Sequence, residues 1–179
     1  MKEHSVPQPS PERMAVVPGR PLVVGVVPGQ PALVALTAAA WAEALGGVRL
    51  YVAYADGARG VNEEFPDGTV RHSSLDPDLS DDAWQRTEAS ITAFLDDLLS
   101  PRGADWQFRY LAGRADRALT HLARAVDASA IVVGAHQPTS GERILPVIER
   151  SVAVRLTRHQ HRPVLVVPLR VVDWQAPTP

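Results

Sequence analysis

The sequence of 179 residues contains no cysteine. This absence excludes disulfide frameworks, thiol catalysis and zinc sites built from cysteine. The sequence also lacks an apolar run long enough for a membrane span, because Gly, Pro or Arg interrupts each run too early. With 18 basic against 20 acidic residues, it lacks the basic excess of proteins that bind nucleic acid along an extended face. We therefore expect neither a membrane nor nucleic acid among its partners.

The two ends of the chain differ from the part between them. Residues 1–20 contain four prolines, no apolar periodicity and no apolar segment behind a positively charged end. No signal peptide is predicted, so a cytoplasmic location is expected. We interpret residues 1–20 and 171–179 as flexible tails. Residues 21–170 then form a single domain, for which 45% hydrophobic and 21% charged residues are ordinary values.

Between the tails, short apolar runs rich in β-branched residues alternate with helical patterns. The pattern predicts strands at 22–27, 48–55, 106–112, 131–134 and 163–167, and helices at about 31–45, 80–99, 118–126 and 147–158. This order predicts a parallel five-stranded sheet with helices on both faces and right-handed crossovers. The 106–112 strand alternates aromatic with polar residues, which places it near the edge of the sheet. Trp41 and Trp84 are expected in the core.

Residues 56–79 show no clear periodicity. They contain three glycines and two prolines, and we interpret them as a long insertion loop, either functional or mobile. His72 in this loop and His121 on a predicted helix are expected at the surface, without a catalytic role.

Two loops that follow strands are candidates for ligand binding, because parallel α/β sheets bind ligands beyond the carboxyl ends of their strands. Residues 27–30 contain one glycine and one proline, which favours a tight turn over a phosphate-binding turn. Residues 134–143 leave a buried strand and precede a helix, where backbone amides could bind an anion. Thr139, Ser140 and Arg143 would add donors, although an ordinary connecting loop also fits this pattern.

The sequence provides no recognisable catalytic or metal-binding set. It has no Gly-x-Ser-x-Gly motif, and its Asp pairs at 81–82 and 96–97 are adjacent helical residues that point in different directions. His159 and His161 lie among arginines near a predicted helix end, where the helix dipole alone favours cations. We therefore expect no catalytic residue and no metal site.

Three stretches of the chain resemble the universal stress protein family over about residues 21–168. They are Leu22-Val23-Val24-Gly25-Val26 with the helix containing Trp41-Ala42; Gly113-Arg114-Ala115 through Ala118-Leu119 and Ala123 to the strand ending at Gly134; and Ser151-Val152, Leu156, Arg158-His159 and Pro163-Val164-Leu165-Val166-Val167. The resemblance implies a Rossmann-like α/β domain of the adenine nucleotide alpha hydrolase type. It also implies a homodimer formed through the last strand, with an interface of Val164, Leu165, Val166, Val167 and Leu169.

The nucleotide-binding branch of that family has an Asp after the first strand and a Gly-x2-Gly-x9-Gly-Ser pattern around the phosphates. Here Val27 occupies the Asp position, and Gly134 and Ser151 match the first Gly and the Ser. Counted forward from Gly134, the second Gly position of the pattern is occupied by Gln137. Counted backward from Ser151, that position is occupied by Ser140, and Gly141 is one position out of register. Arg150 then occupies the position of the last Gly. The candidate nucleotide or anion site comprises Val27, Pro28, Gly29, Gly113, Gly134, His136, Ser140, Gly141, Arg143, Arg150, Ser151 and Val152.

These departures predict a divergent member with a degenerate nucleotide site. Val27 cannot accept a hydrogen bond from a ribose hydroxyl, and Arg150 carries a side chain where close approach to phosphate needs none. We expect a non-catalytic, homodimeric stress-response or regulatory domain that has no cofactor and contacts an unidentified protein partner. The alternative is a nucleotide- or anion-binding module that uses residues 134–151 for ATP or AMP with Mg²⁺, with weak ATP hydrolysis.

Overall fold

The computed structural model describes residues 10–76, 83–135 and 151–169. Its central sheet contains β1 (Leu22–Gly25), β2 (Leu50–Asp56), β5 (Trp106–Ala112), β6 (Ala130–Gly134) and β7 (Val164–Val167). The strands are all parallel and lie in the order β5-β2-β1-β6-β7. The predicted five-stranded parallel sheet is confirmed, and so is the edge position of the 106–112 strand.

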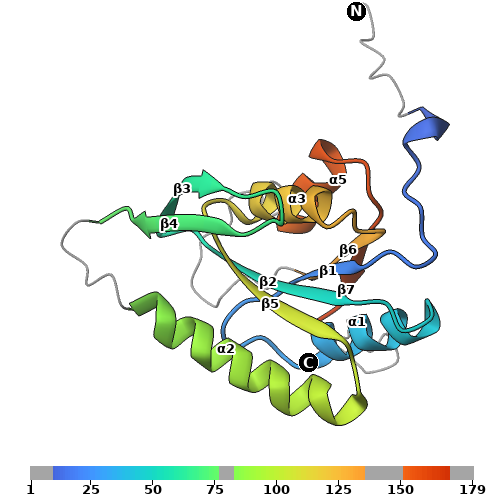
Figure 1. Ribbon diagram of the computed structural model, residues 1–179, viewed down its shortest axis with the longest axis horizontal. Coiled ribbons are helices and arrows are strands. Elements are labelled where there is room, and N and C mark those ends of the chain that lie inside the picture. Colours follow the sequence, from blue (N-terminus) through green and yellow to red (C-terminus); the bar gives the residue numbers. More distant parts are fainter. Residues whose placement is uncertain (1–9, 77–82, 136–150, 170–179) are drawn as a thin grey trace, which may run out of the picture.

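Helices cover both faces of this sheet (Figure 1). The helices α1 (Leu33–Ala44) and α2 (Ala83–Leu99) lie on one face, and α3 (Ala115–Ala125) and α5 (Val152–His159) lie on the other. Two short 3₁₀ turns, Pro11–Arg13 and Ser100–Arg102, precede β1 and follow α2. Within the described ranges, no helix is long and apolar enough to cross a membrane.

The strand β1 is buried on both faces because it lies at the centre of the sheet. Val24 packs into the cluster beneath α1 and α2, and Val23 packs into the cluster beneath α3 and α5. This arrangement explains why the sequence of β1 is apolar throughout, with no polar residue on alternate positions. The same holds for β6, where Val132 faces the first cluster and Ile131 the second.

The expectation that Trp41 belongs to the core is wrong. Helix α1 packs on the sheet through small side chains, Ala35, Ala38 and Ala42, and Trp41 is 50% exposed. Successive helical residues are about 100° apart, so Trp41 lies off the face that Ala35 and Ala42 share. Trp84 is half-buried and lies in an aromatic cluster outside both cores.

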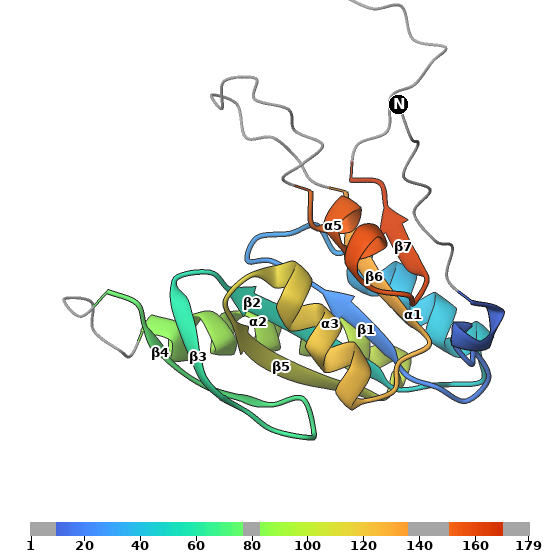
Figure 2. The ribbon, with the colours of Figure 1, turned by 90° about the horizontal axis from the view of Figure 1, so that it is seen from above.

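The expectation of a structureless loop at 56–79 is also wrong. The structure places an antiparallel hairpin there, with strands β3 (Arg59–Glu64) and β4 (Val70–Ser74), beyond the β5 edge of the sheet and beside α3 (Figure 2). The hairpin was not evident in the sequence because its strands are largely polar and the register shifts between Val61 and Glu63. Residues 77–79 lie outside the described residues.

The turn of this hairpin packs directly on α3. The amide of Gly68 donates to the carbonyl of Phe65 at 3.0 Å, and the amide of Phe65 donates to the carbonyl of Thr69 at 2.9 Å. Gly68 has φ +82°, and a Cβ at this position would lie 2.6 Å from Cδ1 of Leu122. Glycine is therefore required at position 68 both by the backbone conformation and by contact with α3.

Substitution of Gly68 with alanine is expected to reduce the free energy of unfolding by about 3 kcal/mol, which combines left-handed strain with steric overlap. Gly103 is a matched control, because it has φ +66° and open space within 4 Å of the position that a Cβ would take. Gly103→Ala should therefore cost only the backbone strain, about 1 kcal/mol. Urea denaturation of both variants measures the difference. Equal losses of the free energy of unfolding in the two variants would show that position 68 is not in close steric contact with α3.

Candidate functional site

A cleft of about 490 Å³ opens at the carboxyl ends of β1, β2 and β6. It lies where the strand order reverses, because β2 and β5 extend from one side of β1 while β6 and β7 extend from the other. Ligands in open parallel sheets bind at this point. The first turn of α3 and the start of α5 close one side of the cleft through Ala115, Leu119 and Val152.

The segment after β1 forms the tight turn that its sequence favours. Pro28 and Gly29 occupy its two central positions, Gly29 has φ +71°, and the amide of Gln30 donates to the carbonyl of Val27 at 3.2 Å. The side chain of Gln30 folds back so that its Oε1 accepts from the amide of Val27 at 3.1 Å. The Val27 amide is thus used within the turn, and the Val27 side chain is 57% exposed and has no polar atom.

Gly134, the last residue of β6, has no side chain and so leaves space for side chains from other parts of the protein. A Cβ at Gly134 would lie 2.9 Å from Cδ1 of Leu169 and 3.2 Å from Cγ2 of Val34. Leu169, which follows β7 and was predicted in the dimer interface, is one of the residues that line the cleft. An apolar side chain therefore occupies the space beside Gly134, where the family resemblance implies a phosphate.

The structure brings part of the predicted site together. Val27, Pro28, Gly29, Gly134 and Val152 all line the cleft. Gly113 does not line it, because it lies in the turn after β5, where φ is +79° and its amide donates to the carbonyl of Asp56 at 2.8 Å. Ser151 is the N-cap residue of α5 and makes no side-chain capping hydrogen bond. His136, Ser140, Gly141, Arg143 and Arg150 lie outside the described residues.

A buried carboxylate stands at the start of α3, close to the cleft. Asp116 accepts two hydrogen bonds from Arg114, at 3.2 and 2.8 Å. Burial alone would raise the pKa of Asp116, but the hydrogen bonds and charge of Arg114, with the charge of Arg155, lower it below the usual value. Asp116 is therefore an ionised structural residue whose charge Arg114 balances, and it is absent from the described lining of the cleft.

The described lining of the cleft offers little polar chemistry. Among those residues, Gln30 alone has a polar side chain, and it already holds the turn. None of the described lining residues is an acid, a base, a hydroxyl or a cation. Across the described parts of the chain, no group of three or more His, Cys, Asp or Glu residues is arranged to hold a metal ion. The described part of the lining is suited to apolar contact more than to proton transfer.

A second polar cluster, not predicted from the sequence, holds the hairpin to the rest of the domain. Arg59 is 5% exposed, and its Nε donates to Nδ1 of His72 at 2.7 Å. The His72 ring contacts the rings of Trp84 and Tyr110, with centroids 5.0 and 5.4 Å apart. The expectation of a surface His72 is therefore wrong, because aromatic rings from α2 and β5 cover it.

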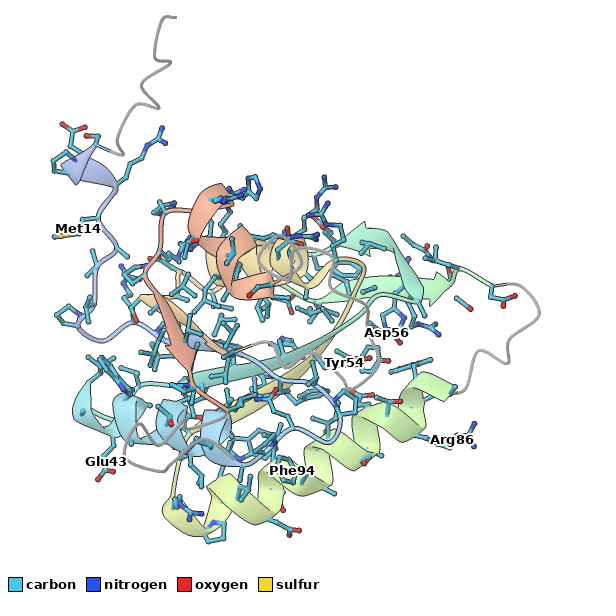
Figure 3. All side chains as sticks on the ribbon, turned by 180° about the vertical axis from the view of Figure 1, so that it is seen from behind. Met14, Glu43, Tyr54, Asp56, Arg86 and Phe94 are labelled. Atoms are coloured by element: carbon cyan, nitrogen blue, oxygen red, sulfur yellow. The ribbon has the colours of Figure 1, made fainter. Side chains whose placement is uncertain are left out.

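Tyr110 links this cluster to the end of β2. Its hydroxyl donates to Oδ2 of Asp56 at 2.7 Å, and its ring packs at nearly a right angle to the ring of Tyr54. Figure 3 labels Tyr54 and Asp56. Burial, followed by the hydrogen bond to Asp56, raises the pKa of Tyr110 well above its usual value. The hydroxyl remains protonated and acts as a donor that fixes Asp56. The cluster unites residues far apart in sequence, and no local motif signals it.

His121 is half-buried on α3 and also differs from the expected surface residue. Its Nδ1 lies 3.2 Å from Oε2 of Glu64 on the hairpin. Its Nε2 is buried and has no hydrogen-bond partner among the described residues. His121 therefore takes part in the contact between α3 and the hairpin.

The last strand exposes one edge in the described structure. Strand β7 pairs with β6 on one side, and Val166 is exposed while Val167 is buried. Val164, Leu165 and Leu169 are half-buried. The predicted dimer through this strand stays a prediction.

Comparison with known proteins identifies the family and the fold. A sequence model described as the universal stress protein family matches residues 19–168. A universal stress protein from Archaeoglobus fulgidus in complex with dAMP has a TM-score of 0.56 at 19% identity, with 82% of this chain and 96% of that chain covered. No curated protein matches the sequence.

Two further solved structures are similar over nearly their whole length. A universal stress protein in complex with cAMP has a TM-score of 0.56 at 23% identity, covering 86% of this chain and 99% of its own. A protein of the same family from Burkholderia pseudomallei has a TM-score of 0.55 at 23% identity, covering 89% of this chain and 99% of its own. At these identities the structural likeness shows a shared fold.

Proposed function

Because this chain belongs to the universal stress protein family, we propose that it is a stress-response domain that acts by binding and not by catalysis. We further propose that its cleft does not hold ATP in the manner implied by the family resemblance. One observation carries this proposal: among the described residues that line the cleft, Gln30 alone has a polar side chain, and its Oε1 is already engaged by the Val27 amide.

The ribose of a nucleotide would find no side-chain carboxylate at position 27, after β1. A ribose hydroxyl that leaves water without a new acceptor loses about 1–3 kcal/mol. Val27 provides an apolar side chain there, and its amide is already bonded. Leu169 adds a further obstacle, because it packs beside Gly134. Together these features support weak or absent nucleotide affinity.

The same lining residues are the reason for proposing that the domain is not catalytic. Hydrolysis needs a group that activates water or stabilises the leaving phosphate. The described lining residues have no titratable side chain. Asp116 is a buried carboxylate on the α3 side of the cleft, and Arg114 neutralises it.

A homodimer through β7 is also part of the proposal. Within the described residues β7 pairs only with β6, and a strand edge left in this state tends to pair with another chain. Val166 adds exposed apolar surface on the same strand. Pairing of two β7 strands would join two sheets into one. A cytoplasmic location is proposed with it.

Nucleotide binding in altered geometry is the second candidate. The cleft volume of about 490 Å³ is within the range of small-ligand sites. Two structures of similar fold are described as complexes with dAMP and cAMP. In this alternative, ATP or AMP with Mg²⁺ would place its base against the apolar lining, and residues 136–150 would have to supply phosphate contacts.

Native mass spectrometry of freshly purified protein, with and without Mg-ATP, tests the proposal. We expect a dimer that carries no nucleotide and does not change mass when ATP is added. A co-purified adenine nucleotide, or a mass shift with ATP, would contradict the proposed loss and favour the second candidate.

The variant Val27→Asp separates a missing ribose contact from a rebuilt site. If the acceptor alone is missing, Val27→Asp should raise ATP affinity about tenfold. The control is Val16→Asp, which makes the same change at an exposed valine before β1. No gain in Val27→Asp would indicate that the loop after β6 no longer accommodates phosphates.

A further inference from the structure

A second groove, of about 570 Å³, runs along the outward face of α3. The hairpin contributes Glu64 to one wall, and the end of α5 contributes His159 to the other. The floor is α3, which lies between these two elements (Figure 2). This groove is separate from the cleft, since the described residues that line the one do not line the other.

The charges in the groove do not balance. Arg114 pairs with Asp116 at 2.8 Å, and Glu64 lies 3.2 Å from Nδ1 of His121, which carries a charge only when protonated. Three arginines therefore face two carboxylates in the described lining. Arg117 and Arg124 are exposed and make no ion pair with any residue in the described ranges. An excess of positive charge therefore lies along this face of α3.

Arg117 and Arg124 form a row on α3. They are seven positions apart on one helix, which places them on the same side and about 10 Å apart along the axis. The opposite face of α3 buries Leu119 and Leu122 against the sheet. Packing of the domain therefore does not require the charges of Arg117 and Arg124, which remain able to attract an oppositely charged partner.

We propose that this groove binds an acidic segment of a partner protein, with carboxylates spaced about two helical turns apart to meet Arg117 and Arg124. The proposal rests on the function proposed above, which assigns the domain a binding role, and it specifies the surface and the chemistry of the partner. The described hairpin takes part by supplying Glu64, which lies 3.2 Å from His121 on the floor of the groove.

The lining favours a protein over nucleic acid. Glu64 and Asp116 interrupt the positive surface, so a continuous phosphate backbone would meet carboxylates as well as arginines. No Phe, Tyr or Trp is among the described residues that line the groove, so bases would lack a large ring on which to stack.

Fluorescence polarisation with a labelled oligoglutamate peptide, about twelve residues long so that it spans more than two helical turns, tests this proposal. We expect binding at low salt that weakens as salt screens the charges. Arg117→Glu and Arg124→Glu should each weaken binding about fivefold, and the double variant about twentyfold. The matched control is Arg86→Glu, which makes the same charge change on α2 at the other face of the sheet and should leave binding unchanged (Figure 3).

Three results would overturn the proposal. The first is no binding of oligoglutamate at low salt. The second is equal weakening by Arg117→Glu and Arg86→Glu, which would reflect net charge alone. The third is tighter binding of a single-stranded oligothymidylate with the same dependence on Arg117 and Arg124, which would assign the groove to nucleic acid.

The proposals for the groove and for the cleft can be contradicted independently of each other. Thermal unfolding of each variant checks that these exposed substitutions leave the fold intact. ATP binding by the wild-type protein would contradict the function proposed for the cleft without affecting the peptide result. A wild-type protein that does not bind the peptide would contradict the groove assignment and leave the proposal for the cleft unchanged.

Discussion

Replacement of Leu122 with alanine is expected to reduce the free energy of unfolding by about 3 kcal/mol. Leu122 is fully buried on α3, in the cluster that packs α3 and α5 against the sheet. The sheet beneath it is fixed by backbone hydrogen bonds on both sides of β1 and cannot collapse into the space left by the side chain. The loss therefore includes both the transfer of the missing methyl groups and the residual cavity.

Guanidinium denaturation measures this loss, and Leu75→Ala is its control. Leu75 is 66% exposed, so its truncation should change the free energy of unfolding by no more than about 0.5 kcal/mol. Leu122 also lies under the hairpin turn, because its Cδ1 lies 2.6 Å from the position that a Cβ of residue 68 would take. Leu122→Ala should therefore also raise amide exchange in β3 and β4. Similar stability losses in the two variants would contradict the assigned packing.

Arg59→Ala is expected to destabilise the hairpin by about 2–3 kcal/mol, because it removes a buried, hydrogen-bonded cation. Without Arg59, Nδ1 of His72 loses its donor and the Trp84 ring loses the guanidinium that lies 5.8 Å from its centroid. Arg59→Lys should recover little, since a lysine lacks the planar group that donates from Nε while lying over an aromatic ring.

Hydrogen exchange detected by mass spectrometry measures this effect, with Arg71→Ala as the control in the same hairpin. Arg71 is exposed and pairs with Glu63 at 2.8 Å, an ion pair of the kind that contributes at most about 1 kcal/mol. We expect faster exchange across residues 59–74 in Arg59→Ala and near-native exchange in Arg71→Ala. Unchanged protection in Arg59→Ala would show that the aromatic contacts alone hold the hairpin.

The central strands could be predicted because their position determines their composition. Residues of β1 and β6 are buried on both faces, so their apolar runs indicate parallel strands without further information. The hairpin could not be predicted in this way. Its strands are largely polar, and the burial of Arg59 and His72 depends on Trp84 and Tyr110, which come from later parts of the chain.

The candidate site was predicted in part for the same reason. The turn at residues 27–30 is local, and Pro28 and Gly29 in the sequence determine it. The role of Leu169 beside Gly134 depends on how the chain returns after β7, which no spacing in the sequence reveals. The groove along α3 likewise depends on Glu64 and His159, which distant parts of the chain bring to its walls.

The central place of β1 has a consequence for how the chain folds as it is synthesised. Leu22 pairs with Leu50 on one side but with Ala130 on the other, so one edge of this early, apolar strand has no native partner until most of the chain has been made. Pairings between distant parts of a sequence form slowly and leave strand edges open to aggregation. A ribosome-bound chain that ends before residue 130 should therefore depend on a chaperone to cover the unsatisfied edge of β1.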